Sequence, residues 1–291
     1  MKHTIGISTW SLQQLSYKRG LKLPQMLELI AGMGVDTIDL YDEYLPLFPE
    51  VNLHKLYEVK KQTEAAGLPI SGTWFFDDLL GSYYNVGLDE TLENTKRFIA
   101  VTAFLESKYM ALPFLINVPG ISLEEAHDTY YKIFEKLLPT AEEYGVYIAA
   151  EAARQYTPAL ALRLYHELKS AFFTVCPDLE AWRLETADIP LVHAENAGGP
   201  PSKPEPVDLF GQCLPYAPYI HFKLLAFDEK GEEPHFPIPQ IMDLINKSSI
   251  AHHLCIEYEG WIPDINPNVD AAVETRRCVE LIKRYLDRSP S

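Results

Sequence analysis

Four β-prone stretches in the second half of the chain carry side chains that could bind a metal ion. The stretches VYIAAE, FFTVCPD, YIHFKL and HLCIEY contain Glu151, Asp178, His221 and Glu257. Carboxylate oxygens combined with one imidazole nitrogen suit Mn²⁺, Mg²⁺, Co²⁺ or Zn²⁺ better than a metal that prefers thiolates. Lys223 follows His221 by two residues and would share its face of a strand. The chemistry depends on whether the fold brings these side chains together.

Short β-prone runs alternate with amphipathic segments along the whole chain. The β-prone runs are residues 4–9, 37–41, 69–74, 108–112, 146–151, 172–178, 219–224 and 253–258. The clearest helical patterns are residues 23–33, 52–66, 90–105, 123–144 and about 269–286. Strand–helix alternation predicts a parallel sheet, and eight such units in 291 residues favour a closed α/β architecture, the (β/α)₈ TIM barrel. A doubly wound sheet is the alternative, but no Gly-x-Gly-x-x-Gly turn follows the first strand.

Glycines mark the ends of several predicted helices. Gly34, Gly67 and Gly145 each stand just before a β-prone run, where glycine allows the left-handed conformation that caps a helix. The stretch at 194–206, rich in proline and glycine, is expected to be a long loop. Nothing else in the composition suggests a linker, so we expect one TIM-barrel domain over residues 1–291.

Alternation along barrel strands predicts which side chains face the interior. In the last strand, Leu254 and Ile256 would pack against helices, while Cys255 and Glu257 would face inward. The same alternation points the other polar side chains inward: Glu151, Asp178, His221 and Lys223. Active sites of TIM barrels lie at the C-terminal ends of the strands. Three carboxylates gathered there would repel one another, and one divalent cation would remove that conflict.

Several of these residues also have a simpler interpretation. A single inward carboxylate often forms a structural salt bridge, and a single strand histidine is often a hydrogen-bonded core residue. The case for a metal therefore depends on four such residues occurring in phase. Trp10 and Trp74 end the first and third strands and could line a substrate pocket, although most aromatic residues are core. Glu259 shares the phase of Glu257 but lies past the strand, so we expect it at the pocket rim or next to the metal ligands, and not on the metal itself.

Composition excludes several classes of function. The net charge is −16 and no cluster of Lys and Arg is present, which argues against nucleic acid as a partner. No apolar run reaches the roughly 18 residues of a membrane helix, and the first residues lack a signal-peptide pattern. The four cysteines are widely spaced, so neither a zinc knuckle nor a disulfide framework is indicated. We expect a cytoplasmic protein that acts on a small molecule.

The order of the motifs resembles the xylose isomerase-like TIM-barrel superfamily, which includes the sugar phosphate isomerase/epimerase family and inosose dehydratases. The motifs are GISTWSL in the first strand, GVYIAAE, Pro-Asp at 177–178, HFK at 221–223 and IEYEG at 256–260. The resemblance covers almost the whole chain. It implies that Glu151, Asp178, His221 and Glu257 bind one divalent metal ion, with a sugar or polyol completing its coordination.

The resemblance also implies the reaction. A metal-dependent sugar or polyol isomerase or epimerase removes a proton next to the metal-bound carbonyl, through an enediolate. Glu151 and Glu257 would be the catalytic acid–base pair. Lys223 would either hold a substrate oxygen or form a salt bridge with a ligand carboxylate. The identity of the sugar, its phosphorylation and the formation of a homo-oligomer stay open.

Departures from the family pattern leave other functions open. Many relatives follow the first glutamate with Asn-His, whereas here Arg154 comes third after Glu151. Arg154 could bind an anionic part of the substrate or pair with an acidic neighbour. The stretch AFDEKGEEPHFPIPQIMDLI is similar to the metal-binding subunits of C-glycoside-cleaving lyases, which work with a small second subunit. A lyase, either of this kind or an inosose-type dehydratase, is therefore the alternative. An apurinic endonuclease-like protein and a non-catalytic binding protein are more remote.

Overall fold

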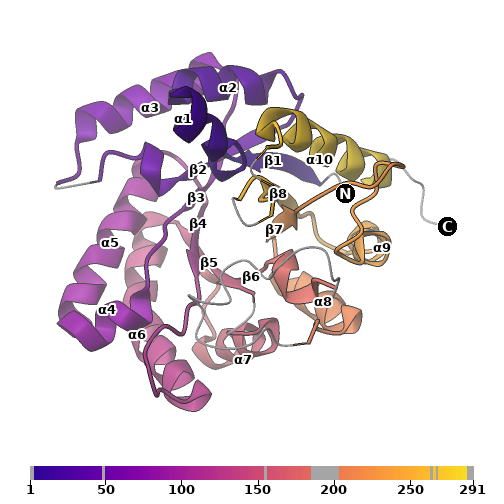
Figure 1. Cartoon of the computed structure of the whole chain (residues 1–291). Helices are drawn as coiled ribbons and strands as arrows, with labels where there is room; N and C mark the ends of the chain where they lie inside the picture. Colours follow the sequence, from indigo (N-terminus) through magenta and orange to yellow (C-terminus); the bar gives the residue numbers. More distant parts are fainter. Residues whose placement is uncertain are drawn as a thin grey trace.

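A sheet of eight parallel strands forms the centre of the structure (Figure 1). The computed structural model describes residues 3–47, 50–153, 156–184, 203–262, 265–266 and 268–286. The strands are β1 Thr4–Ser8, β2 Thr37–Tyr41, β3 Ile70–Trp74, β4 Tyr109–Pro113, β5 Tyr147–Ala152, β6 Phe173–Pro177, β7 Tyr219–Leu224 and β8 His253–Tyr258. Each strand pairs with the next along the chain from β1 to β6, and β1 also pairs with β8. A single bridge between Asp178 and His221 links β6 to β7, so the sheet is a nearly closed barrel, as predicted.

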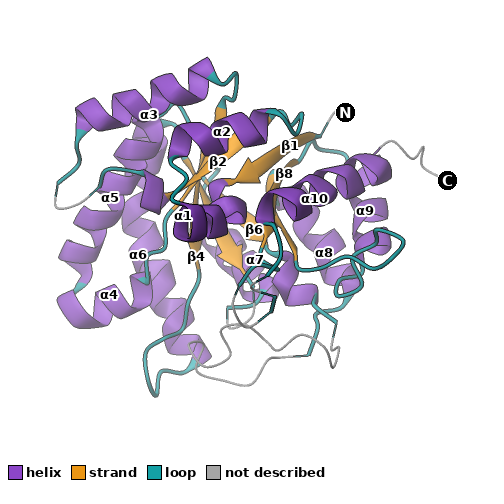
Figure 2. Ribbon diagram, turned by 45° about the horizontal axis from the view of Figure 1, so that its top comes forward, coloured by secondary structure: helices purple, strands orange, loops and turns teal. Residues whose placement is uncertain are grey.

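Helices surround this sheet on its outer side (Figure 2). They are α1 Gln13–Arg19, α2 Leu23–Ala31, α3 Leu53–Ala65, α4 Leu79–Val86, α5 Leu88–Phe104, α6 Leu123–Tyr144, α7 Pro158–Leu168, α8 Val207–Cys213, α9 Ile238–Asn246 and α10 Ala271–Leu286. Short 3₁₀ helices follow three of the strands: η1 Thr9–Leu12, η2 Asp42–Tyr44 and η3 Leu179–Trp182. None of the helices in the described part of the chain combines the length and hydropathy that a membrane crossing requires.

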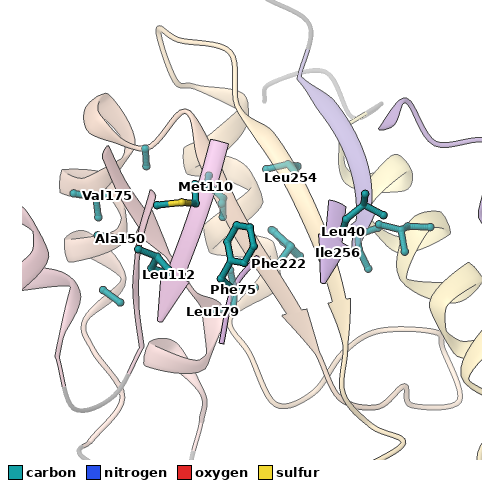
Figure 3. Packing of buried hydrophobic residues seen from close by; sticks show 14 of the residues in the cluster. Leu40, Phe75, Met110, Leu112, Ala150, Val175, Leu179, Phe222, Leu254 and Ile256 are labelled. Carbon is teal, nitrogen blue, oxygen red and sulfur yellow. The ribbon is translucent and has the colours of Figure 1, made fainter. Parts of the chain in front are cut away.

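The hydrophobic core lies between the sheet and the helices. Val175, Phe222, Leu254 and Ile256 point from the strands into this layer and are fully buried (Figure 3). These are outward positions of the predicted alternation, which is therefore confirmed. Burial of each such side chain contributes about 1.5–3 kcal/mol relative to exposure. The outer faces thus stabilise the barrel and leave the inner faces available for polar groups.

The barrel interior is filled differently at its two ends. Small side chains occupy the middle, including Cys176 and Cys255, both fully buried. At the N-terminal end, the Asp39 carboxylate accepts hydrogen bonds from Tyr219 Oη at 2.9 Å and from His253 Nε2 at 3.0 Å. Gly72 makes room for this group, because a Cβ there would collide with Asp39 and Tyr219. The Asp39 carboxylate is therefore satisfied by its neighbours, and the polar side chains predicted to do chemistry lie at the other end.

Candidate metal centre

Side chains from four neighbouring strands converge at the C-terminal end of the barrel. Glu151 comes from β5, Asp178 directly follows β6, His221 comes from β7 and Glu257 from β8. One ligand atom from each residue lies within 4.8 Å of the others, and all four side chains are buried. The structure therefore brings together all four residues that were predicted to bind a metal. We refer to Glu151, Asp178, His221 and Glu257 as the quartet.

The local fold around Asp178 directs one of its oxygens into the quartet. Asp178 stands at the start of η3, where its Oδ1 accepts a hydrogen bond from the Glu180 backbone N–H at 2.7 Å. A carboxylate that caps a helix in this way is held in one orientation. Its other oxygen, Oδ2, is consequently left to face His221 and Lys223. Strand β6 ends one residue earlier than predicted, because Asp178 leaves the ladder to make this cap.

Buried atoms of the quartet lack the hydrogen bonds that burial normally requires. Among the described residues, neither ring nitrogen of His221 has a partner in hydrogen-bond geometry, and Asp178 Oδ2 has only the Lys223 ammonium, 3.0 Å away as an ion pair. His221 Nδ1 lies 3.5 Å from Glu151 Oε2 and 3.6 Å from Glu257 Oε2. Each unsatisfied buried polar group costs about 1–3 kcal/mol. The unsatisfied atoms and the donor set, three carboxylates and one imidazole, both fit a divalent cation.

Without an ion, the quartet holds protons in place of a metal. Burial raises the pKa of Asp178 to about 7 and that of Glu257 to about 8. Burial also acts on Glu151, but attraction to His221 outweighs it and lowers the pKa to about 2. For His221, attraction to Glu257 and Glu151 outweighs burial and raises the pKa to about 9. Neighbouring carboxylates cannot all ionise cheaply, so the metal-free site retains protons at neutral pH.

Lys223 adds a positive charge beside the quartet. Its Nζ lies 3.0 Å from Asp178 Oδ2, 3.2 Å from Glu259 Oε1 and 4.0 Å from Glu257 Oε2. Burial alone would lower the pKa of Lys223, but attraction to these carboxylates raises it well above its usual range. Lys223 is therefore a permanent cation. Of the two roles predicted for it, the salt bridge is present, and contact with a substrate oxygen stays a prediction.

Two tryptophans lie beside the carboxylates. The indole N–H of Trp74 donates to Glu151 Oε2, and that of Trp10 donates to Glu259 Oε1 at 3.0 Å. The rings belong to a larger aromatic cluster, in which Tyr41 packs against Trp74 in a tilted arrangement with centroids 4.9 Å apart. Trp10 and Trp74 thus lie at the candidate site, and their contact with substrate stays a prediction. Arg154, also predicted to bind substrate, lies outside the described residues.

Glu259 has a larger part in the site than its position past β8 suggested. It is 7% exposed and contacts both Lys223 and Trp10. The next residue, Gly260, passes so close to the Leu225 carbonyl that any Cβ would collide with it. This tight passage turns the chain just after Glu259. The two-residue spacing from Glu257 pointed to Glu259 in the sequence, and the structure adds its partners Lys223 and Trp10.

Cys255 also comes near the quartet without belonging to it. Its sulfur and ligand atoms of His221 and Glu257 lie within 4.8 Å of one another. Burial and the nearby Asp39 and Glu257 carboxylates raise the pKa of the Cys255 thiol well above its usual range. A thiol that stays protonated is a poor metal ligand. This agrees with the expected role of Cys255 as a small buried side chain.

Comparison with known proteins adds a family and relatives to this geometry. The family model described as xylose isomerase-like TIM barrel matches residues 27–280. The C-glycoside deglycosidase alpha subunit of Arthrobacter globiformis is 26% identical over 187 residues, covering 44% of this chain and 51% of that protein. The corresponding subunit of Microbacterium trichothecenolyticum is 33% identical over 58 residues, covering 20% of this chain and 16% of that protein. The chain thus spans about half or less of the curated relatives that it matches.

Solved structures match over nearly the full length of the chain. L-ribulose 3-epimerase has a TM-score of 0.73 at 16% identity, covering 98% of this chain and 95% of that chain. D-psicose 3-epimerase from Clostridium cellulolyticum H10 has a TM-score of 0.74 at 11% identity, covering 98% and 100%. The 3-keto-D-glucoside 4-epimerase of E. coli has a TM-score of 0.67 at 15% identity, covering 97% and 100%. At these identities the likeness establishes the fold. Because the family model spans most of the sequence, the chain belongs to the xylose isomerase-like TIM barrel family.

Proposed function

We propose that the protein is a divalent-metal-dependent isomerase or epimerase of a small sugar or polyol. The observation that carries this proposal is the buried quartet, in which three carboxylates meet one imidazole and both His221 ring nitrogens lack hydrogen bonds among the described residues. The fold neighbours named as ribulose and psicose epimerases support a sugar as the substrate. One neighbour, a xylose isomerase-like protein from Mycobacterium smegmatis, was solved in complex with magnesium. A net charge of −16 disfavours the apurinic endonuclease alternative, which must attract DNA phosphates.

The quartet residues would hold the ion, and those that carry a proton without it would have to lose that proton. When bound, a divalent ion supplies the positive charge that neutralises the carboxylates and draws electron density toward neighbouring sugar oxygens. Glu151 and Glu257 enter the cluster from β5 and β8, which are separated by two strands. We propose that one of them accepts the proton from the carbon next to the sugar carbonyl and that the other returns a proton.

The residues around this pair would orient it. Trp74 fixes Glu151 through its indole N–H, while Lys223 lies near Glu257 and Asp178. A general base must be held within hydrogen-bond reach of the proton that it takes. The aromatic rings of Trp10 and Trp74 would exclude water on the side of β1 and β3. Lys223 would stabilise negative charge that develops on a substrate oxygen.

Hydrogen exchange with solvent tests the proposed function directly. Purified protein supplied with Mn²⁺, Mg²⁺, Co²⁺ or Zn²⁺ would be incubated in D₂O with ketoses, 3-keto sugars and inososes. The expected result is incorporation of deuterium at the carbon next to the carbonyl of one substrate, detected by mass spectrometry and NMR. Isomerisation or epimerisation would accompany it, without other change in mass. Metal-loaded protein that exchanges no substrate proton would contradict the proposal.

A lyase on the same site is the second candidate. Both curated relatives are named C-glycoside deglycosidase alpha subunits, although the matches cover only part of each protein. A lyase would begin with the same proton removal, so the quartet does not separate the two reactions. The products do separate them, because a dehydratase substrate loses water and a C-glycoside releases its aglycone. If a second subunit is needed, the isolated chain would bind the metal ion without completing the reaction.

Replacing Trp74 by phenylalanine is expected to slow proton exchange roughly 10- to 100-fold, the usual effect of losing a group that orients a metal ligand. Trp74→Phe removes the N–H that Glu151 accepts while keeping an aromatic ring. Trp261→Phe is the matched control, because among the described residues the Trp261 N–H has no hydrogen-bond partner. The exchange rate and the metal content would be measured for both variants. Equal losses in the two would mean that ring packing, and not the hydrogen bond to Glu151, matters.

A further inference from the structure

Lys223 is shared between two kinds of carboxylate. Asp178 Oδ2 at 3.0 Å and Glu257 Oε2 at 4.0 Å belong to the quartet, whereas Glu259 Oε1 at 3.2 Å does not. An ammonium group on Asp178 Oδ2 occupies the oxygen that a metal ion would need. It also repels a divalent cation a few ångströms away, because charges inside a protein are weakly screened. Lys223 therefore competes with the ion for which the quartet is suited.

Glu259 is fixed where it can draw Lys223 away from the quartet. Its backbone N–H donates to the Leu224 carbonyl at 2.9 Å, and Gly260 makes the tight turn that follows. Its Oε1 accepts the Trp10 indole N–H at 3.0 Å and contacts Lys223 through the same oxygen. Trp10 in turn is packed against Trp261, with ring centroids 5.2 Å apart. Glu259 is thus anchored from three sides and cannot follow Lys223 toward Asp178.

We propose that Glu259, anchored by Trp10, is a positioning residue that gives the Lys223 ammonium a second partner, so that Lys223 can leave Asp178 when a divalent ion binds to the quartet. The inference rests on the proposed function only in that the quartet binds the ion. With Glu259 in place, Lys223 keeps a partner when Asp178 and Glu257 are engaged elsewhere. Without it, the partners left to Lys223 among these carboxylates are those of the quartet, and the ammonium stays on the oxygen that the ion needs.

The proposal assigns opposite effects to the two members of one ion pair. Lys223→Met removes the competing cation and is expected to tighten divalent-ion binding roughly tenfold. Glu259→Gln removes the alternative partner of Lys223, leaves the ammonium on Asp178 and is expected to weaken binding by a factor of about ten. Trp10→Phe changes no charge but frees the Glu259 carboxylate, and is expected to weaken binding about threefold. A purely supporting role for Lys223 in the fold would not produce a gain of affinity.

The experiment is a titration of chelator-treated protein with Mn²⁺ at fixed pH, followed by calorimetry and by the paramagnetic resonance of free Mn²⁺. It compares the wild type, the three single variants and the double variants Lys223→Met/Trp10→Phe and Lys223→Met/Glu259→Gln. If Trp10 acts through Lys223, its effect disappears in the Lys223→Met background. In the Lys223→Met background, Glu259→Gln should weaken ion binding only through the loss of one nearby negative charge. Glu43→Gln is the control, since it removes an exposed carboxylate bonded to Gln13 and Tyr17, away from Lys223.

The outcomes separate this inference from the proposed function. Wild-type binding with weaker or unchanged binding by Lys223→Met would overturn the inference and leave the metal site standing. A Trp10→Phe effect that persists without Lys223 would overturn it as well. Binding by Lys223→Met alone, with none by the wild type, would overturn the inference, because Glu259 would then fail to make the quartet accessible, and it would also contradict a resident metal. Absence of binding in every variant, with folding verified by circular dichroism, would overturn both.

Discussion

Glu257→Ala is expected to abolish divalent-ion binding and to lower substrate-proton exchange by on the order of 10³-fold. Glu257 is 3% exposed, lies 3.6 Å from His221 Nδ1, and is one of the two proposed acid–base groups. Its loss removes both a ligand and a proton carrier, so the two effects compound. Elemental analysis of protein purified without chelator should show about one divalent ion per wild-type chain and background levels in the variant.

Two further variants show whether this loss is specific. Glu280→Ala removes an exposed glutamate on α10 and should leave metal content and exchange unchanged. Glu257→Gln keeps the shape of the side chain and should unfold at no lower temperature than the wild type in chelator. The reason is that burial holds the pKa of Glu257 at about 8, so the ionised acid costs stability in the metal-free fold. A wild type that contains no metal under metal-replete conditions would refute the metal assignment.

The metal-free protein is expected to lose stability as the pH rises from about 5 to about 9. Asp178 and Glu257 have folded pKa values of about 7 and 8, above the ordinary values of 3.8 and 4.5 for these side chains. The folded state therefore keeps protons that the unfolded state has lost, and the free energy of unfolding falls with pH across those windows. The pKa of His221 is raised from 6.5 to about 9, so its contribution to stability is complete below pH 6.5 and lost by about pH 9. The pKa of Glu151 is lowered from 4.5 to about 2. Its contribution to stability is therefore lost as the pH falls, and only below pH 4.5.

Addition of metal should reverse this loss. The three groups titrate as one coupled system, and together the expected decrease amounts to several kcal/mol, measured as urea midpoints between pH 5 and 9 in chelator. An excess of Mn²⁺ at 100 times its dissociation constant would restore about 2.7 kcal/mol. Glu257→Ala should show a flatter pH profile and no response to Mn²⁺. A metal-free wild type whose stability is constant or rises over this range would contradict the electrostatics described for the quartet.

Strand positions and strand faces could be predicted because they follow from local patterns. The bounds expected for β2, β7 and β8 are those observed, and Leu254 and Ile256 point outward as their alternation requires. Helix ends were less regular. The pattern at 23–33 ends as a helix at Ala31, because Gly32 and Gly34 follow. The short helices α1 and α4 were not predicted, since α1 directly follows η1 and α4 contains Gly81 and stops before Gly87.

The inward orientation of the quartet side chains could be predicted from the sequence, but the contacts of the residues around them could not. Inward phase placed Glu151, His221 and Glu257 correctly because each lies within a regular strand. Glu259 lies beyond β8, where period-two alternation ends and the turn at Gly260 decides its direction. Its partner Trp10 is nearly 250 residues away along the chain. No local pattern encodes a contact of that kind, and the same holds for the bond between Trp74 and Glu151.

The single bridge between Asp178 and His221 has a mechanical consequence. Within the described residues, the other neighbouring strands are joined by ladders of paired residues. Strands β6 and β7 lie side by side but are joined in backbone pairing by this one bridge. The barrel wall therefore has a seam, and two of the four proposed ligands stand on its opposite edges. An ion bound by both Asp178 and His221 would link the two sides of that seam. Binding of the ion and closure of the barrel between β6 and β7 would then occur together. Loss of the ion would loosen the barrel at this junction, where strand pairing is weakest.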